Sequence, residues 1–157
     1  MYWRRSLTRL ELGLYAALIG VAVALLADRL LDTMEIAERA AMDVTLTRIN
    51  SAINVQLAAD RFGGRLPRIA EALQRNPFEV AKMSPGNFLG ELEEPDLELL
   101  ERGNWLFDRT RKELVYLPRL RRGLQSPEAV LRFRLERRGP EAYALVPVRP
   151  YLWRPGM

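Results

Sequence analysis

The sequence contains no cysteine and no histidine. The first absence excludes a thiol nucleophile and any disulfide, and the two together exclude most zinc sites and the commonest general base of enzymes. Neither a Gly-x-Ser-x-Gly segment nor a glycine-rich phosphate-binding loop occurs in the chain. We therefore expect a protein that is not an enzyme and has no cofactor, no metal site and no catalytic residue.

Lysine is also scarce, because Lys82 and Lys112 are the only two, and nearly all positive charge is carried by arginine. Seven arginines concentrate in the C-terminal part of the chain: Arg119, Arg121, Arg122, Arg132, Arg134, Arg137 and Arg138. A basic face can indicate nucleic-acid binding. Few aromatic residues are interleaved with these arginines, so we expect a solvated sheet face or an acidic protein partner, and not nucleic acid.

Charge is absent altogether from Leu12 to Ala27. With its flanks, the apolar segment from Leu10 to Leu31 would form a helix about 30 Å long, the thickness of the hydrocarbon core of a membrane. A buried core helix would usually be amphipathic, and a secretory signal would be followed by a cleavage site with small residues. The segment has neither feature, so it predicts a transmembrane helix over residues 7–31.

The charges on either side of this segment predict its orientation. Arg4, Arg5 and Arg9 precede it, whereas four carboxylates against Arg29 follow it. The carboxylates are those of Asp28, Asp32, Glu35 and Glu38. The positive-inside rule places the N-terminus in the cytoplasm. We expect a single-pass protein of the bacterial inner membrane with its C-terminal domain in the periplasm.

The N-terminus resembles the class III signal of the type IV pilin-like proteins. Ser6 stands where the family usually has glycine, and Leu7-Thr8-Arg9-Leu10-Glu11 stands where it has a block such as Phe-Thr-Leu-Ile-Glu, with Thr8 and Glu11 matching. Gly20 falls where many pseudopilins of type II secretion systems have a glycine. The resemblance implies a leader over residues 1–6, cleavage between Ser6 and Leu7 by the prepilin peptidase, and methylation of the new N-terminus.

Glu11 is a carboxylate at the head of an apolar run, where burial in a membrane is costly. The resemblance implies an assembly role for Glu11, in which its carboxylate pairs with the α-ammonium of a neighbouring subunit. Such a pair would recover part of the cost of burying either charge. The alternative is a pair within the chain, between Glu11 and Arg9 or Arg5 at the lipid interface.

A second helical segment, over residues 32–62, continues the first. Apolar residues recur at spacings of three and four along one face: Met42, Leu46, Ile49, Ile53 and Leu57. We expect this stripe to pack on the chain's own domain. An opposing polar face is predicted for Arg39, Asp43, Thr47, Asn50 and Asn54. Glu35 and Arg39 have the spacing of an ion pair, and Phe62-Gly63-Gly64 predicts the end of the helix.

Residues 63–104 read as a loop region. Pro67 to Arg75 predicts a short helix ended by Asn76-Pro77-Phe78, and Met83 to Asn87 predicts a turn. Six acidic residues follow: Glu91, Glu93, Glu94, Asp96, Glu98 and Glu101. Their spacing matches no calcium-binding loop, so we expect a solvated acidic loop.

Residues 105–157 predict a small antiparallel β-sheet with one polar face. Four strands are indicated, around turns at Arg109–Lys112 and Arg138–Glu141: Trp105–Asp108, Glu113–Leu117, Leu131–Glu136 and Tyr143–Val148. Pro147 indicates an edge strand or a strand end. The expected fold is α+β, a long N-terminal membrane-spanning helix whose periplasmic half packs on this sheet.

The order of stem helix, loop and meander also resembles that of minor pilins and pseudopilins. Segments that carry this second resemblance are Asn76-Pro77-Phe78, Pro85 to Glu91, Trp105 to Asp108 and Leu114 to Leu117, which look like those of pseudopilin-like and mannose-sensitive-haemagglutinin-type minor pilins. The two resemblances cover most of the chain.

The resemblances imply a minor pilin or pseudopilin, a structural subunit of a type IV pilus or of a type II secretion pseudopilus. Its implied partners are other pilin-like subunits, the prepilin peptidase, the inner-membrane assembly platform and membrane lipid. The alternative is an uncleaved, signal-anchored periplasmic scaffold protein of an envelope complex. Processing of the leader distinguishes the two.

Overall fold

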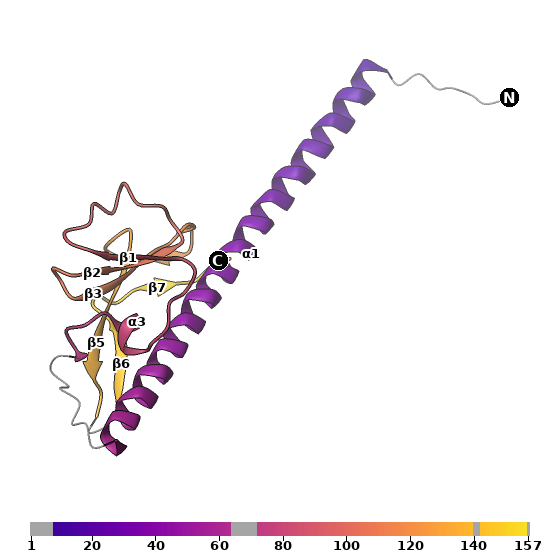
Figure 1. Cartoon of the computed structure of the whole chain (residues 1–157). Helices are drawn as coiled ribbons and strands as arrows, with labels where there is room; N and C mark the ends of the chain where they lie inside the picture. The colour runs from indigo at the N-terminus through magenta and orange to yellow at the C-terminus, as the bar shows by residue number, and fades with distance from the viewer. Residues whose placement is uncertain (1–7, 64–71, 140–141, 157) are drawn as a thin grey trace.

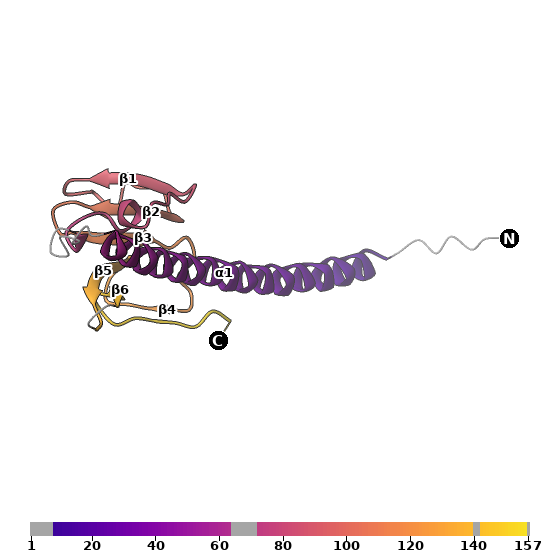
Figure 2. The ribbon, with the colours of Figure 1, turned by 60° about the horizontal axis from the view of Figure 1, so that its bottom comes forward.

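The computed structural model describes residues 8–63, 72–139 and 142–156. Its dominant element is α1 (Arg9–Phe62), a single helix of 54 residues. At 1.5 Å per residue, α1 is about 80 Å long. Figures 1 and 2 show its first half extending away from the rest of the molecule, and its second half lying along the sheet. The predicted helix end is confirmed, because α1 ends at Phe62 and glycine follows.

The rest of the described chain forms a small domain on the second half of α1. Its elements are α3 (Pro77–Val80), β1 (Phe88–Leu92), β2 (Asn104–Asp108), β3 (Glu113–Leu117), β4 (Leu124–Gln125), β5 (Leu131–Arg137), β6 (Tyr143–Pro147) and β7 (Leu152–Trp153). Five strands form one sheet in the order β1-β2-β3-β5-β6, and β4 pairs with β7 in a second, two-stranded sheet. The expected α+β fold, a long helix followed by a sheet, is confirmed.

The main core lies between α1 and one face of the sheet. The helix contributes the predicted stripe, of which Met42, Ile49, Ile53 and Leu57 are at most 4% exposed. The sheet and the segments beside it contribute large buried side chains to this core: Trp105, Leu114, Tyr116, Leu131, Phe133, Tyr143, Leu145 and Trp153. Burial of a large apolar side chain contributes about 1.5–3 kcal/mol. The stripe therefore serves the chain's own domain, as predicted.

The other face of the sheet is not polar at its centre, which corrects our expectation. Leu106, Val115 and Leu117 are fully buried there. They are covered by three leucines of β1 and the following loop, Leu92, Leu97 and Leu100. The acidic side chains of this loop remain exposed between the leucines. The loop thus covers this face of the sheet with its leucines and exposes its acidic side chains to solvent.

The sheet begins earlier than predicted, because β1 lies inside the segment 63–104. It pairs with β2 in parallel, so the sheet is mixed, while the other pairs are antiparallel. The loop 93–103 returns the chain across the sheet before β2 begins, which makes the parallel pairing geometrically available. Gly90 has φ +104°, a conformation suited to glycine, at the place where the register between β1 and β2 shifts.

Two helix asparagines close the β6 edge of the sheet. The Asn54 amide donates to the carbonyl of Tyr143 (2.8 Å) and accepts from its N–H (2.9 Å), and the Asn50 oxygen accepts from the N–H of Leu145 (2.8 Å). Pro147, at the end of the strand, has no N–H to leave unpaired. The edge position predicted from Pro147 is confirmed. The assignment of Asn50 and Asn54 to the face opposite the stripe is wrong, since both point toward the sheet.

Other local predictions have mixed outcomes. The turn at Arg109–Lys112 and the strands around it are confirmed. Asn76-Pro77-Phe78 begins a helix, because the Asn76 side chain accepts from the N–H of Phe78 as the N-cap of α3. The helix predicted from Pro67 to Arg75 falls largely outside the described residues, as do Pro140 and Glu141. The strands β4 and β7 were not predicted.

Candidate functional site: the apolar anchor and its attachment to the domain

The first functional feature is the unpacked part of α1. Every residue from Thr8 to Leu31 is exposed, including large apolar side chains such as Leu10 (81%) and Leu26 (69%). Within the described residues, this helix is long and apolar enough to cross a membrane. That finding is consistent with a single-pass membrane protein. We call residues 8–31 the anchor.

The N-terminal end of the anchor is a capping box. The Glu11 carboxylate accepts from the N–H of Thr8 (2.8 Å), and the Thr8 hydroxyl accepts from the N–H of Glu11 (3.3 Å). This reciprocal pair satisfies two N–H groups that would otherwise lack a partner at a helix start. Glu11 therefore contacts Thr8 here and not Arg9. Ser6, Leu7 and Arg5 lie outside the described residues.

The second functional feature is the attachment of the domain to α1, at the C-terminal end of the anchor and just beyond it. The Glu38 carboxylate accepts three hydrogen bonds from the domain, from the Tyr116 hydroxyl (2.9 Å), the N–H of Arg119 (2.7 Å) and the N–H of Leu120 (3.0 Å). Both of its oxygens are used. Burial, together with the negative charge of Glu38, raises the pKa of Tyr116, so its hydroxyl stays protonated and donates.

Glu35 is fully buried one turn nearer the anchor. One oxygen, Oε1, accepts from the indole N–H of Trp153 (2.8 Å) and from the N–H of Gly123 (3.0 Å). The other oxygen has no hydrogen-bond partner among the described residues. A side chain at Gly123 would collide with the backbone of Arg154, so glycine permits this close approach. Glu35 thus joins α1 to β7 and to the residue that precedes β4.

The predicted Glu35–Arg39 pair is wrong. Arg39 donates to the carbonyl of Trp153 and pairs with Asp43 (3.6 Å). Both members of the expected pair are used to hold the C-terminal strand instead. A helix-surface rule assumes that both side chains face solvent, and at Glu35 that condition fails.

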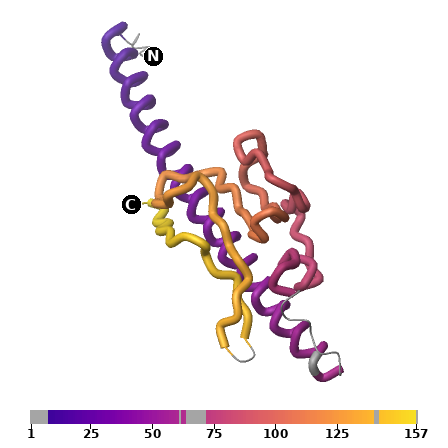
Figure 3. Tube along the Cα trace, turned by 90° about the vertical axis from the view of Figure 1, so that its left-hand side faces the viewer, coloured from indigo at the N-terminus to yellow at the C-terminus, as the bar shows by residue number. Residues whose placement is uncertain are grey.

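Arg122 completes the attachment from the domain side. Its guanidinium lies 2.7 Å from Asp28 and 3.7 Å from Asp32. Its hydrogen bond to Asp28 and the nearby carboxylates raise its pKa. The loop 118–123 therefore meets α1 at four carboxylates on one side of the helix. We call Asp28, Asp32, Glu35 and Glu38, with the loop 118–123 and Trp153, the clamp. Figure 3 shows the orange segment after β3 crossing α1 where the helix leaves the domain.

The arginines of β5 do not form a free basic face. Arg132 lies within ion-pair distance of Glu128 (2.9 Å), Glu113 (3.4 Å) and Asp108 (3.6 Å). Arg134 pairs with Glu113 at 2.7 Å. These carboxylates offset the positive charge that nucleic-acid binding would require.

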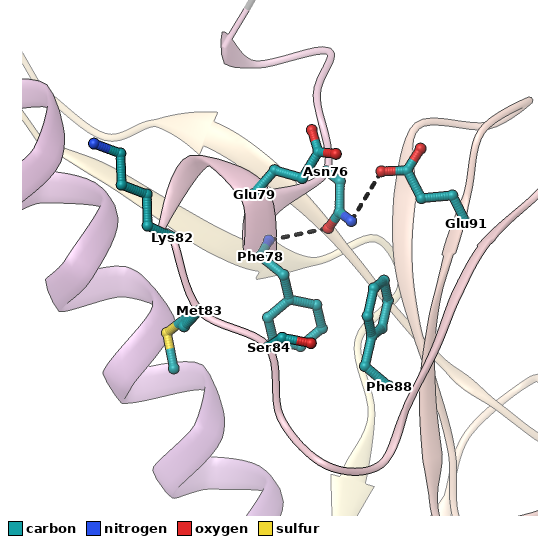
Figure 4. A pocket seen from close by; sticks show the side chains of 8 residues that line it. All are labelled: Asn76, Phe78, Glu79, Lys82, Met83, Ser84, Phe88 and Glu91. Carbon is teal, nitrogen blue, oxygen red and sulfur yellow. Dashed lines mark hydrogen bonds between the residues drawn. The ribbon is translucent and has the colours of Figure 1, made fainter.

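The side of the domain near α3 carries a groove of about 410 Å³, drawn in Figure 4. The rings of Phe78 and Phe88 meet edge to face at 4.8 Å inside it. Asn76 donates to Glu91 (3.0 Å) while capping α3, and Lys82 extends away from the rings. The hydrogen bond between Asn76 and Glu91 links the start of α3 to β1. Among the described residues, no cluster of three acidic side chains is arranged to bind a metal ion.

Comparison with known proteins finds no relative: no family model, no curated protein and no solved structure matches the chain.

Sequence reasoning missed the clamp, although one signal was available. Glu35 lies seven residues before Met42, and therefore on the same helix face as the apolar stripe. A carboxylate on a buried face needs hydrogen-bond donors. The donors are backbone amides, an indole and a hydroxyl that are 78 or more residues away along the chain, and no local pattern identifies them. The capping box, by contrast, was readable from Thr-x-x-Glu.

Proposed function

We propose that this chain is a pilin-like structural subunit, a minor pilin or pseudopilin of a type IV pilus or type II secretion pseudopilus. It is anchored in the bacterial inner membrane with its N-terminus in the cytoplasm and its domain in the periplasm. Its role is structural and not enzymatic, and its partners are other pilin-like subunits, the prepilin peptidase and the assembly platform. The observation that carries the proposal is that α1 is one unbroken helix. Its first half is exposed and apolar, and its second half contributes one face to the core of the chain's own domain.

Physical chemistry links this helix to assembly. An exposed apolar surface as long as the anchor is not tolerated in water and must be covered by lipid or by other helices. The domain does not need the anchor for its own core, because the stripe from Met42 to Leu57 already fills it. The anchor is therefore free to exchange lipid for the helices of other subunits, as in a filament.

One observation favours the alternative, an uncleaved, signal-anchored periplasmic scaffold of an envelope complex. A Glu11 oxygen already accepts the N–H of Thr8 within its own chain. A carboxylate that caps its own helix has a function without any neighbouring subunit. Under this alternative the N-terminus would remain intact.

The mass of the mature N-terminus tests the proposal. In membranes with an active prepilin peptidase, we expect the protein to begin at Leu7, with a methylated amine. Cells without the peptidase are the control and should retain Met1. Because Ser6 and Arg9 differ from the usual signal, we expect partial processing, and Ser6→Gly should increase the cleaved fraction. Intact Met1 in all of these samples would contradict the filament subunit and support the scaffold.

A further inference from the structure

The clamp fixes the position of the loop 118–123 along the axis of α1, relative to the anchor. Asp28 is the first charged residue after the apolar run, and Arg122 contacts both Asp28 and Asp32. From Asp28 to Asp32 the helix rises about 6 Å. The headgroup layer on each side of the hydrocarbon core is about 5–8 Å thick. If the anchor spans a membrane, the Arg122 guanidinium lies at the level of the lipid headgroups.

The loop 118–123 itself carries three arginines and no acidic residue. Arg121 and Arg122 are exposed, and we call these two residues the arginine rim. Asp28 and Asp32 offset Arg122, but no acidic group lies within ion-pair distance of Arg121 in the described parts of the chain. The acidic loop 93–103 covers the sheet face opposite α1.

The rim is presented by a loop with a fixed backbone. The N–H groups of Arg119, Leu120 and Gly123 all donate to carboxylates of α1. The Glu35 and Glu38 carboxylates thereby face the domain, where they accept hydrogen bonds from it. A loop held in this way loses little conformational entropy when its side chains bind. Guanidinium groups suit phosphate, with which they form charge-assisted hydrogen bonds.

We propose that the arginine rim docks the domain onto the anionic phospholipid headgroups of the membrane that the anchor spans. This inference rests on the membrane anchoring in the proposed function and adds a second, electrostatic contact to it. Two observations support lipid as the occupant: the surface is continuous with the anchor, and its charge is complementary to that of an anionic leaflet. Docking would hold the domain in one orientation before the subunit leaves the bilayer.

The test uses the full-length protein in lipid nanodiscs of phosphatidylcholine, with and without phosphatidylglycerol. Unfolding of the domain is followed by tryptophan fluorescence. A ligand that binds only the folded domain raises its unfolding temperature. We expect phosphatidylglycerol to raise that temperature by a few degrees at low salt, and the shift to shrink as salt is added.

Variants identify the groups responsible. Arg121→Gln with Arg122→Gln should abolish the lipid-dependent shift, and Arg121→Gln alone, which leaves the Asp28 contact intact, should reduce it. The matched control is Arg137→Gln with Arg138→Gln, at the far end of β5, which should keep the shift. For each variant, the measured quantity is the difference in unfolding temperature between discs with and without phosphatidylglycerol. A general loss of stability lowers both temperatures and leaves this difference interpretable.

Three results would overturn the proposal. The shift could be absent in the wild-type protein, or it could persist in the Arg121/Arg122 variant. Inorganic phosphate added to neutral discs could also reproduce it, which would assign the rim to a soluble anion. Failure of the chain to enter any disc is a different result, because it would refute the membrane anchoring itself.

Discussion

At the residue scale, the helix cap that Glu11 forms can be separated chemically from the assembly role that we propose for it. Capping the helix requires an oxygen that accepts the N–H of Thr8, and a neutral side chain can supply it, since capping boxes use glutamine as well as glutamate. Pairing with the ammonium of a neighbouring subunit requires the negative charge. A substitution that keeps the oxygen and removes the charge therefore distinguishes a local function from an assembly function.

We expect Glu11→Gln to insert into the membrane at least as well as the wild-type chain, because a charge is removed from an apolar environment. Its incorporation into filaments should fall, because the cation of the neighbour loses its partner. Glu11→Ala should lose assembly too, and in addition the hydrogen bond that the Glu11 carboxylate accepts from the N–H of Thr8. The measurement is the ratio of filament-associated to membrane-associated protein. Normal assembly of Glu11→Gln would leave capping as the function of Glu11.

The residues that sequence analysis placed correctly are those whose environment follows from their own neighbours. Ile49 and Ile53 were assigned to the core from spacing alone, and both are fully buried. Asn50 and Asn54 were misplaced, because polarity was taken to mean solvent. Their partners are the backbone groups of Tyr143 and Leu145. A polar residue on the flank of a buried stripe can equally well serve an exposed sheet edge, and only the fold decides which.

At the element scale, the clamp is a helix face that uses carboxylates to bind backbone amides of a loop. The buried Glu35 and the half-buried Glu38 differ in one respect that can be tested. Glu35 uses a single oxygen for both of its hydrogen bonds, whereas Glu38 uses both oxygens. An amide has one accepting oxygen. It can replace Glu35 without losing a bond, but it cannot replace Glu38 in the same way.

We therefore expect Glu38→Gln to lower the free energy of unfolding by about 1–3 kcal/mol, because the part-buried N–H of Leu120 loses its acceptor and the other two donors lose a charged one. Glu35→Gln should change it by less than about 1 kcal/mol, since its remaining oxygen still accepts from Trp153 and Gly123. Denaturant unfolding of the two variants in detergent micelles measures the difference. Equal losses in both would mean that the charge of Glu35, and not its oxygen, holds the C-terminal strand.

Elements with a strong internal period were predictable, and those defined by their partners were not. The strand β5 alternates apolar and polar residues and was found with its limits nearly correct. β4 and β7 have two residues each, and they exist because Gly123 lets the two segments approach. β1 contains Gly90 and an acidic residue, which weaken a strand signal, and its pairing with β2 depends on a loop that first covers the sheet.

At the scale of the whole molecule, one helix serves two environments that meet within a single turn. Residue 31 is still exposed, and Glu35 is completely buried. The anchor can thus be removed without opening the core, while the clamp keeps Asp32, Glu35 and Glu38. A fragment without the anchor can therefore test whether the stripe from Met42 to Leu57 forms the core of the domain or a contact between subunits.

A fragment that begins at residue 32 should therefore be soluble, monomeric and folded, as judged by size-exclusion chromatography and a cooperative thermal transition. In that fragment, Ile53→Asp should abolish folding. It removes a fully buried apolar side chain, worth about 1.5–3 kcal/mol, and leaves an unpaired charge in the core, out of a total stability of about 5–15 kcal/mol. Val55→Asp is the matched control, because Val55 lies on the same helix and is 69% exposed, and it should fold normally. If Ile53→Asp also folds, the stripe is not core. The face from Met42 to Leu57 would then be a surface on which subunits meet.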